Sequence, residues 1–351
     1  MIYSWTAVKL SRTRMGLDPD RVLLKQAGWA AIALIAAWVS ARVPLEWIRA
    51  RAQWLLGILL ALLGLTLVPG IGKTVNHSRR WLEIGPVTMQ ASEFLKIAVI
   101  VYLADRLARR EESTKTDATP WPALLAPIGI GIVFIMAEPD LGTSLFVASI
   151  AVVMLGLAGV RPGKLLPYAA VALPLLVAIA SARFHHVNER LGWFAHGAKA
   201  DPQQWNGVVA IGSGGWTGQG LGAGTQKLGR VPEMQNDFIF TLIGEELGFL
   251  GCVSVILAFM GIVVYGRRIA ERAHASAGLF PYYLAAGSTF AVAFQALINI
   301  AVATGSAPNK GVSLPFISVG GSNLVTAFVA IGFLVNVSRR VATEEGGDPW
   351  R

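Results

Sequence analysis

Long apolar runs, separated by short polar or basic segments, repeat along nearly the whole chain. A run of about 20 apolar residues has the length that a helix needs to cross the hydrocarbon core of a bilayer. The pattern therefore predicts an all-α polytopic membrane protein with about nine transmembrane helices. The expected helices are 26–43, 53–70, 92–108, 122–137, 141–160, 165–181, 237–264, 281–303 and 322–340.

The composition agrees with a membrane protein and excludes several other classes. Hydrophobic residues make up 54% of the 351 residues and charged residues 15%, whereas soluble domains carry about 25% charged residues. The net charge of +9 is expected to face anionic lipid headgroups, and no basic stretch interleaved with aromatic residues indicates nucleic-acid binding. Cys252 is the only cysteine, and the five histidines show no zinc spacing, so no metal site built from cysteine or histidine is predicted.

Arginine clusters in alternate loops predict the orientation of the chain. They are Arg42 with Arg49 and Arg51; Arg106 with Arg109 and Arg110; Arg161 with Lys164; Arg267 with Arg268 and Arg272; and Arg339 with Arg340. Basic loops tend to stay in the cytoplasm, which places segments 72–91, 182–236 and 304–321 on the outer face. No soluble domain interrupts the spans, so residues 1–351 are expected to form a single domain, with 182–236 as its large extracytoplasmic loop.

Asp237 lies where the long outer loop meets an apolar helix. An aspartate at this position suits a helix N-cap, and the same position also holds a carboxylate at the aqueous mouth of the helix bundle. Thr241, Gly244 and Glu245 follow with helical spacing and predict a small, polar stripe that faces the bundle. Asp237 is therefore the candidate for chemistry, while Glu245 or Glu246 suits a structural ion pair as well as a functional role.

Cations gather in the outer segments beside this carboxylate. Glu93 and Lys96 are three residues apart at a helix start, so they can form a structural salt bridge. Alternatively, Lys96 binds a pyrophosphate together with Arg79 and Arg80, because guanidinium groups suit phosphate oxygens. Lys227 and Lys310 are further outer-face cations.

The glycine-rich segment 210–224 invites comparison with phosphate-binding loops. No strand precedes it, and Lys227 does not follow a glycine at the Walker A spacing, so neither nucleotide motif is present. Irregular backbone near a cavity of the bundle is the better interpretation. The proline- and glycine-rich segment 304–323, which contains Ser318 and Ser322, similarly suggests a shaped site.

These motifs occur in an order that resembles the SEDS family of bacterial cell-wall polymerases. They are Arg80-Trp81; Ser92-Glu93 with Lys96; Glu138-Pro139-Asp140-Leu141-Gly142-Thr143; Asp237-Phe238-Ile239-Phe240; and Leu314-Pro315-Phe316-Ile317-Ser318 with Gly320-Gly321-Ser322. Segments 224–227 and 308–311 are closer to the family's division branch, FtsW, than to its elongation branch, RodA; the sporulation branch, SpoVE, stays open. Two departures are Val319, where the family usually has tyrosine, and Met1-Ile2-Tyr3-Ser4, which resembles the end of a first helix that is otherwise missing here.

The resemblance implies a ten-helix bundle that polymerises lipid II, an undecaprenyl-pyrophosphate-linked disaccharide peptide, on the outer face of the bacterial cytoplasmic membrane. It implies Asp237 as the essential aspartate and general base, and Glu93 with Lys96 as the pair that lines the central cavity. Arg79, Arg80, Lys96, Lys227 and Lys310, helped by Mg²⁺ or Mn²⁺, are candidates to offset the pyrophosphate charge, and Ser318 and Ser322 are candidates to bind substrate.

The resemblance also implies partners and a place in the cell. A class B penicillin-binding protein, which crosslinks the peptides, and other membrane proteins of the divisome are the expected partners at the division septum. Two other functions stay open: a lipid II translocase, and a scaffold that only recruits the penicillin-binding protein. Polar groups that cluster at the outer face, rather than along the full bilayer depth, favour the enzyme.

Overall fold

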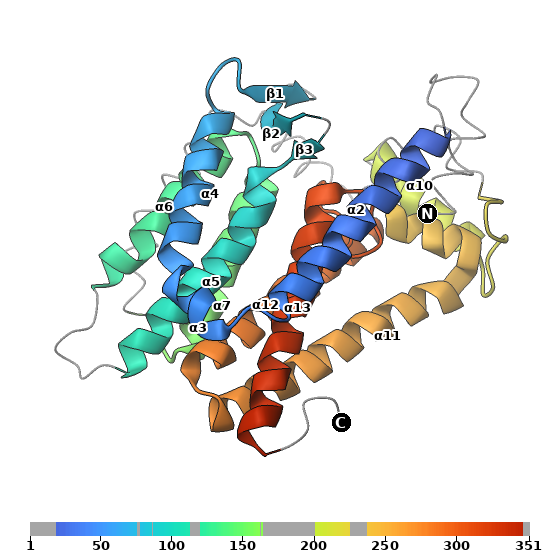
Figure 1. Ribbon diagram of the computed structural model, residues 1–351. Helices are drawn as coiled ribbons and strands as arrows, with labels where there is room; N and C mark the ends of the chain where they lie inside the picture. Colours follow the sequence, from blue (N-terminus) through green and yellow to red (C-terminus); the bar gives the residue numbers. More distant parts are fainter. Residues whose placement is uncertain are drawn as a thin grey trace. The chain divides into compact units, whose positions relative to one another are not determined.

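A computed structural model describes residues 19–75, 78–85, 87–112, 120–161, 163, 201–224 and 237–346 (Figure 1). The helices are α2 (Pro19–Ser40), α3 (Leu45–Ala50), α4 (Ala52–Thr66), α5 (Ala91–Glu112), α6 (Trp121–Ala137), α7 (Leu141–Leu157), α10 (Pro202–Ser213), α11 (Ile239–Ser276), α12 (Leu279–Ala303) and α13 (Gly321–Glu344). The strands are β1 (Gly72–Val75), β2 (Ser78–Ile84) and β3 (Val87–Met89).

The predominantly helical, membrane-type fold is confirmed. Four of the described helices contain apolar windows long enough to cross a membrane, in Leu23–Ser40, α11, α12 and α13, and three shorter apolar helices accompany them. Helices cover eight of the nine predicted spans, and the ninth, 165–181, lies outside the described residues.

The prediction that all secondary structure is helical is wrong in the outer segment 72–91. Its strands form an antiparallel sheet in the order β1-β2-β3. Leu82 illustrates the register, because it pairs with Gly72 on one side and with Met89 on the other. The strands span only 4, 7 and 3 residues, so their period-two pattern is too short to stand out beside the long apolar helices.

The chain forms two compact units. The first unit comprises 1–35, 186–262 and 292–327, and the second comprises 36–185, 263–291 and 328–351. Helices α2, α11, α12 and α13 each contribute residues to both units. The organisation into a single domain stays a prediction.

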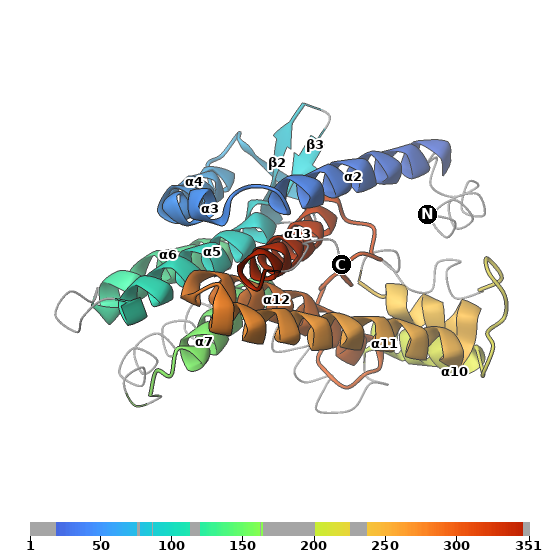
Figure 2. The same cartoon turned by 60° about the horizontal axis from the view of Figure 1, so that its bottom comes forward.

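Helix α5 is the centre of the second unit. It packs against α4 and α7, and α6 lies against α4 and α7, as both views show (Figures 1 and 2). An unbroken stretch of α5, from Leu95 to Asp105, is buried, including the polar residues Lys96 and Asp105. The sheet contacts α4 and α5 through β2, so it is anchored to the same helices.

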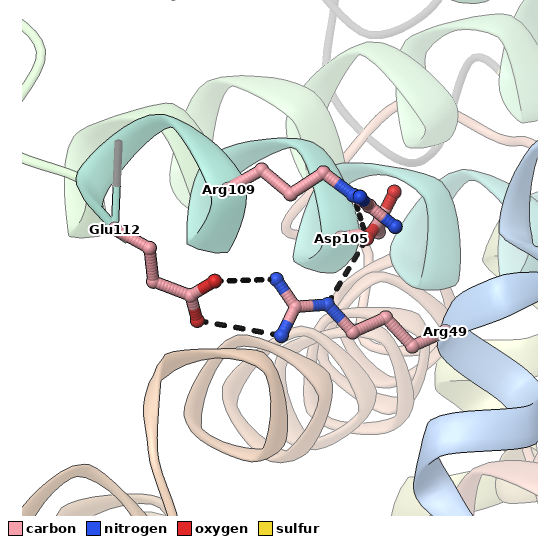
Figure 3. A network of polar contacts seen from close by, with 4 residues as sticks. All are labelled: Arg49, Asp105, Arg109 and Glu112. Atoms are coloured by element: carbon pink, nitrogen blue, oxygen red, sulfur yellow. Dashed lines mark hydrogen bonds and ion pairs between the residues drawn. The ribbon is translucent and has the colours of Figure 1, made fainter. Parts of the chain in front are cut away.

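A network of ion pairs joins α3 to the end of α5 (Figure 3). Asp105 is 1% exposed, and its Oδ1 accepts hydrogen bonds from Arg49 Nε at 3.1 Å and Arg109 Nε at 2.6 Å. Arg49 also donates to Glu112, with 2.6 Å between Nη2 and Oε2. The buried carboxylate is thus compensated by two guanidinium groups, as a buried charge requires.

Replacing Asp105 with asparagine is expected to destabilise the protein by about 1.5–3 kcal/mol, because Arg49 and Arg109 each lose a charge-assisted hydrogen bond. Thermal unfolding in detergent measures the loss. The control is Glu271→Gln, which removes the partner of Arg267 from a pair whose side chains are 77% and 57% exposed and should change stability little. Equal shifts in Tm for the two variants would contradict a stabilising role of the network.

In the first unit, α11 is interrupted at Gly248, and the preceding glycine-rich segment forms hydrogen bonds with residues on both sides of the interruption. Gly248 has φ 69° and ψ −164°, a backbone conformation that only glycine adopts readily. Gln219 N donates to the carbonyl of Glu245 at 3.0 Å, and Phe249 N donates to the carbonyl of Gly215 at 2.9 Å. The predicted polar stripe is buried, but it lies on an interrupted helix rather than the continuous one expected from the sequence.

Candidate functional site

The predicted site residues divide between the two units. The first unit holds Asp237, Lys310, Ser318 and Ser322, and the second holds Arg79, Arg80, Glu93 and Lys96. Lys227 lies outside the described residues.

Asp237 lies two residues before the start of α11 and is half-buried. Its main-chain carbonyl accepts a hydrogen bond of 2.7 Å from Nδ2 of Asn299 on α12. Its carboxylate lies against Gly311, where a Cβ atom would be only 2.7 Å from Oδ2. Because Gly311 is exposed, the carboxylate lies beside backbone that solvent or a substrate can reach.

Buried side-chain amides hold the neighbouring segment 304–318 in place. Asn299 donates to the carbonyl of Val312 at 2.6 Å as well as to Asp237. The other bonds run from Gln204 to Val302 and Ala307, from Gln295 to Ser313, and from Asn309 to Asp201. The amide side chains are at most 8% exposed, so the segment that carries Lys310 is a shaped structure, as its prolines and glycines suggested.

Ser318 has a structural contact of its own. It is 1% exposed, and its Oγ accepts a hydrogen bond of 2.7 Å from Leu314 N, which closes the turn after Pro315. Within that turn Phe316 has φ 66°, an uncommon conformation for a residue with a side chain, and its ring stacks on Phe259 at 6.2 Å. Non-glycine residues in this region often mark functional sites. Ser322, at the start of α13, is also buried.

In the second unit, Glu93 and Lys96 form the ion pair that their spacing allows. Lys96 Nζ lies 2.8 Å from Glu93 Oε2, and the side chains are 6% and 13% exposed. The ammonium group also lies 4.7 Å from the ring centroid of Phe146 on α7. The salt bridge is therefore present, and the role of Lys96 in binding a pyrophosphate stays a prediction.

Arg80 forms hydrogen bonds with the backbone of the hairpin between α6 and α7. Its Nε donates to the carbonyl of Glu138 at 2.9 Å, its Nη2 donates to the carbonyl of Pro139, and its Nη1 lies 3.8 Å from Asp140. Successive residues of a strand point to opposite sides, and the preceding residue of β2, Arg79, is exposed. Arg79 thus has the more accessible guanidinium group for a substrate phosphate.

Glu138 belongs to this hairpin and was not among the predicted site residues. It is 1% exposed; Thr66 Oγ1 donates to its Oε1, and its Oε2 has no hydrogen-bond partner among the described residues. Burial raises the pKa of Glu138 to about 8; the hydrogen bond from Thr66 lowers the pKa, the negative charge of Asp140 raises it further, and the charge of Arg80 lowers it. In the sequence, the only indication of a role for Glu138 was its place in the motif Glu138-Pro139-Asp140-Leu141-Gly142-Thr143.

Glu138→Gln is expected to remove a pH dependence of stability. The raised pKa means that the folded protein keeps a proton that the unfolded chain loses above about 4.5, so stability falls as the pH rises toward about 8. A shift of this size corresponds to a difference on the order of 5 kcal/mol. The Tm of the variant should match that of the wild type near pH 5 and should be higher than that of the wild type at pH 8.5.

The measurement is Tm in detergent from pH 5 to pH 9 for both proteins. Glu83→Gln, which replaces an exposed carboxylate on β2, is the matched control and should leave the pH profile unchanged. Parallel pH profiles for wild type and Glu138→Gln would show that the buried carboxyl does not titrate in this range.

The two glutamates of the interrupted helix lie under the glycine-rich segment. Glu245 is fully buried, and a Cβ atom at Gly224 would be 2.8 Å from its Oε2. Glu246 is 4% exposed, and its Oε2 accepts a hydrogen bond of 2.9 Å from Gly222 N. Glu246 therefore helps to fix the segment, which agrees with irregular backbone rather than a nucleotide loop.

The described residues contain no group of three or more His, Cys, Asp or Glu that could hold a metal ion. Mg²⁺ is usually held by one or two carboxylates together with substrate phosphates. Asp237 is a carboxylate of that kind, so the predicted divalent cation would need oxygens from the substrate.

A model of the family FTSW_RODA_SPOVE, described as "Cell cycle protein", matches residues 1–343. Two similar proteins bear the name "Probable peptidoglycan glycosyltransferase FtsW". The one from Saccharophagus degradans is 38% identical over 331 residues, which cover 92% of this chain and 84% of the relative. The one from Trichlorobacter lovleyi is 35% identical over 343 residues, which cover 96% and 88%.

Two solved structures share the fold. One, described as "Structural coordination of polymerization and crosslinking by a peptidoglycan synthase complex", has a chain with TM-score 0.73 and 24% identity, covering 96% of this chain and 94% of that one. The other is the rod shape determining protein RodA of Thermus thermophilus, with TM-score 0.64 and 25% identity, covering 95% and 93%.

Proposed function

The chain belongs to the FtsW/RodA/SpoVE family, and from this premise we propose that it is a peptidoglycan glycosyltransferase of cell division. It polymerises lipid II into glycan strands on the outer face of the cytoplasmic membrane, with Asp237 as general base. The family supports the reaction class, because similar proteins bear the name of a probable peptidoglycan glycosyltransferase.

The observation that carries the role of Asp237 is its fixed position. Asn299 holds the main chain of Asp237 and that of Val312 at once, and the carboxylate lies against exposed Gly311. A general base must stay within hydrogen-bond reach of the proton that it removes. A carboxylate whose main chain is held in this way, beside the segment that carries Lys310, suits that requirement.

In the proposed reaction, Asp237 takes the proton of a sugar hydroxyl of the acceptor. The hydroxyl oxygen then forms a bond to the anomeric carbon of the donor, and the bond from that carbon to the lipid pyrophosphate breaks. The pyrophosphate leaves with the electron pair, so cations must offset its charge. Lys310 is the candidate in the first unit, Arg79, Arg80 and Lys96 are those in the second, and Lys227 is a further one.

A transpeptidase of the class B penicillin-binding type is the proposed partner. A structure that shares this fold is described as a peptidoglycan synthase complex that coordinates polymerization and crosslinking. Work at the division septum is supported by the FtsW name of the similar proteins.

The test is glycan-strand formation from purified lipid II by the full chain, with and without the transpeptidase. Strands whose length grows with time in the presence of the wild type support the glycosyltransferase. A parallel assay follows the movement of fluorescent lipid II across vesicle membranes. Movement without strand formation would favour a translocase. The absence of both strands and lipid II movement, with or without the transpeptidase, would favour a scaffold.

A further inference from the structure

Helix α3 and the ends of α5 and α13, each of which carries arginines, lie at one end of the second unit (Figures 1 and 2). Four contacts connect these elements with one another, with the loop after α2 and with α12: Arg339 to the carbonyl of Ala41 at 3.2 Å, Arg340 to Glu46 at 3.6 Å, Arg49 to Glu112 at 2.6 Å, and Arg49 to the ring of Phe280 at 5.8 Å. This end therefore concentrates the positive charge that the sequence assigned to the cytoplasmic face.

Two kinds of arginine occur at this end, one close to carboxylates and one over aromatic rings, and Arg49 makes both contacts. Those of the first kind lie within 4 Å of carboxylates: Arg49, Arg109, Arg267 and Arg340. Those of the second kind contact aromatic rings: Arg42 over Trp38 at 4.5 Å, Arg51 over Trp47 at 3.9 Å, and Arg268 over Tyr265 at 5.7 Å. Within the described part of the chain, no carboxylate neutralises Arg42, Arg51 or Arg268.

The aromatic rings under these arginines are themselves exposed. Trp38 is 57% exposed, Trp47 is 50% exposed and Tyr265 is 65% exposed. A guanidinium group that stacks on a ring keeps its N–H donors at the edge, directed away from the ring face, and loses little freedom when it binds an anion. The arrangement is thus prepared for an oxygen-rich anion such as a phosphate.

Exposed apolar side chains continue from these pairs along the helices. Val39 is 43% exposed beside Trp38, Trp54 and Ile58 are 75% and 57% exposed in the helix that follows Arg51, and Val264 is 44% exposed beside Tyr265. An apolar strip that ends in aromatic rings and then in arginines matches the order of a bilayer from acyl chains to headgroups. The ligand that fits both parts is a phospholipid.

We propose that Arg42 with Trp38 and Arg51 with Trp47 bind the phosphate groups of anionic phospholipids in the leaflet that faces this end, and that Arg268 with Tyr265 forms a third contact of the same kind. The uncompensated charge selects anionic over zwitterionic headgroups, because a positive surface gains free energy from the net negative charge of the lipid. The proposal does not depend on the proposed glycosyltransferase activity.

The experiment compares two double variants of the full chain that lose the same charge. Arg42→Gln/Arg51→Gln removes two ring-stacked arginines, and Arg267→Gln/Arg340→Gln removes two that are paired with carboxylates. The purified proteins in detergent are titrated with phosphatidylglycerol or phosphatidylcholine. Tm is measured throughout, and native mass spectrometry counts the lipids that stay bound.

Phosphatidylglycerol is expected to raise the Tm of the wild type and of the control, and to need at least a threefold higher concentration with Arg42→Gln/Arg51→Gln. Phosphatidylcholine should have a smaller effect on all three proteins. Equal responses of the two double variants, or a wild type that does not distinguish the lipids, would overturn the proposal. So would the same rise in Tm with inorganic phosphate, because the acyl chains would then be irrelevant.

If the double variant does not fold, the single variants Arg42→Gln and Arg51→Gln provide the test. Both residues are exposed, so each can be replaced alone. Each single variant should show part of the loss. Unchanged lipid binding by both single variants that fold would also overturn the proposal. Selective loss of binding to an acidic protein from the same membrane, with lipid binding intact, would assign the surface to a protein instead.

Discussion

Asp237→Asn is expected to lower the rate of lipid II polymerisation by roughly 10²–10⁴-fold, the usual contribution of a general base. Asparagine has nearly the shape of aspartate, but its amide cannot accept the proton of the attacking hydroxyl. The fold should survive, because Asn299 bonds the main-chain carbonyl of residue 237 and not its side chain. The Tm of the variant should therefore stay close to that of the wild type.

The assay measures glycan-strand formation under single-turnover conditions, together with Tm. Glu83→Gln, which neutralises another carboxylate of an outer segment at an exposed position, is the control and should keep full activity. An active Asp237→Asn protein would remove Asp237 from the chemistry. A variant that loses activity and Tm together would show that the residue is structural.

Gly311→Ala is expected to reduce polymerisation about 100-fold without unfolding the protein. The new Cβ atom would come within 2.7 Å of Asp237 Oδ2, closer than non-bonded atoms approach, so the carboxylate must rotate or shift. A displacement of about 1 Å from the productive geometry can cost about this factor in rate. Because Gly311 is exposed, the added methyl group displaces no core residue.

The matched control is the same substitution nine residues along the same segment. At Gly320 a Cβ atom would meet only Asn323 Cβ at 3.8 Å and Ser313 Oγ at 3.9 Å, which are ordinary contacts. Gly320→Ala should therefore keep activity within about threefold, since surface substitutions change free energies by about 0.5 kcal/mol. Equal losses in the two variants would indicate that the segment, and not the carboxylate of Asp237, is sensitive.

Much of the helical fold could be predicted because hydrophobic length is a local signal. Helices α5, α6 and α7 begin and end within about four residues of their predicted bounds. The arginine clusters of 42–51 and 339–340 are in contact with each other, as expected for loops on one face of the membrane, and the orientation of the chain stays a prediction. The sheet at 72–89 could not be predicted, because its short strands are stabilised by pairing with one another and by contact with α4 and α5.

The candidate site could be predicted only in part. Asp237 and the pair of Glu93 with Lys96 were identifiable from position and motif, and the pair is present at 2.8 Å. The supporting residues were not identifiable, because their partners are distant in sequence. Asn299 is 62 residues from Asp237 and Gln204 is 98 residues from Val302, and no periodic pattern connects residues over such separations.

The break in α11 has a consequence for how the protein enters the membrane. Gln219 and Gly220 donate to the carbonyls of Glu245 and Glu246, and in return Phe249 and Leu250 donate to the carbonyls of segment 215–216. Each segment alone would leave several backbone groups without partners, which apolar surroundings penalise heavily. The two segments should therefore enter the membrane together during synthesis, so α10 should wait beside the membrane until the first turns of α11 have been made. The amide hydrogens of both segments should also exchange with solvent at the same rate.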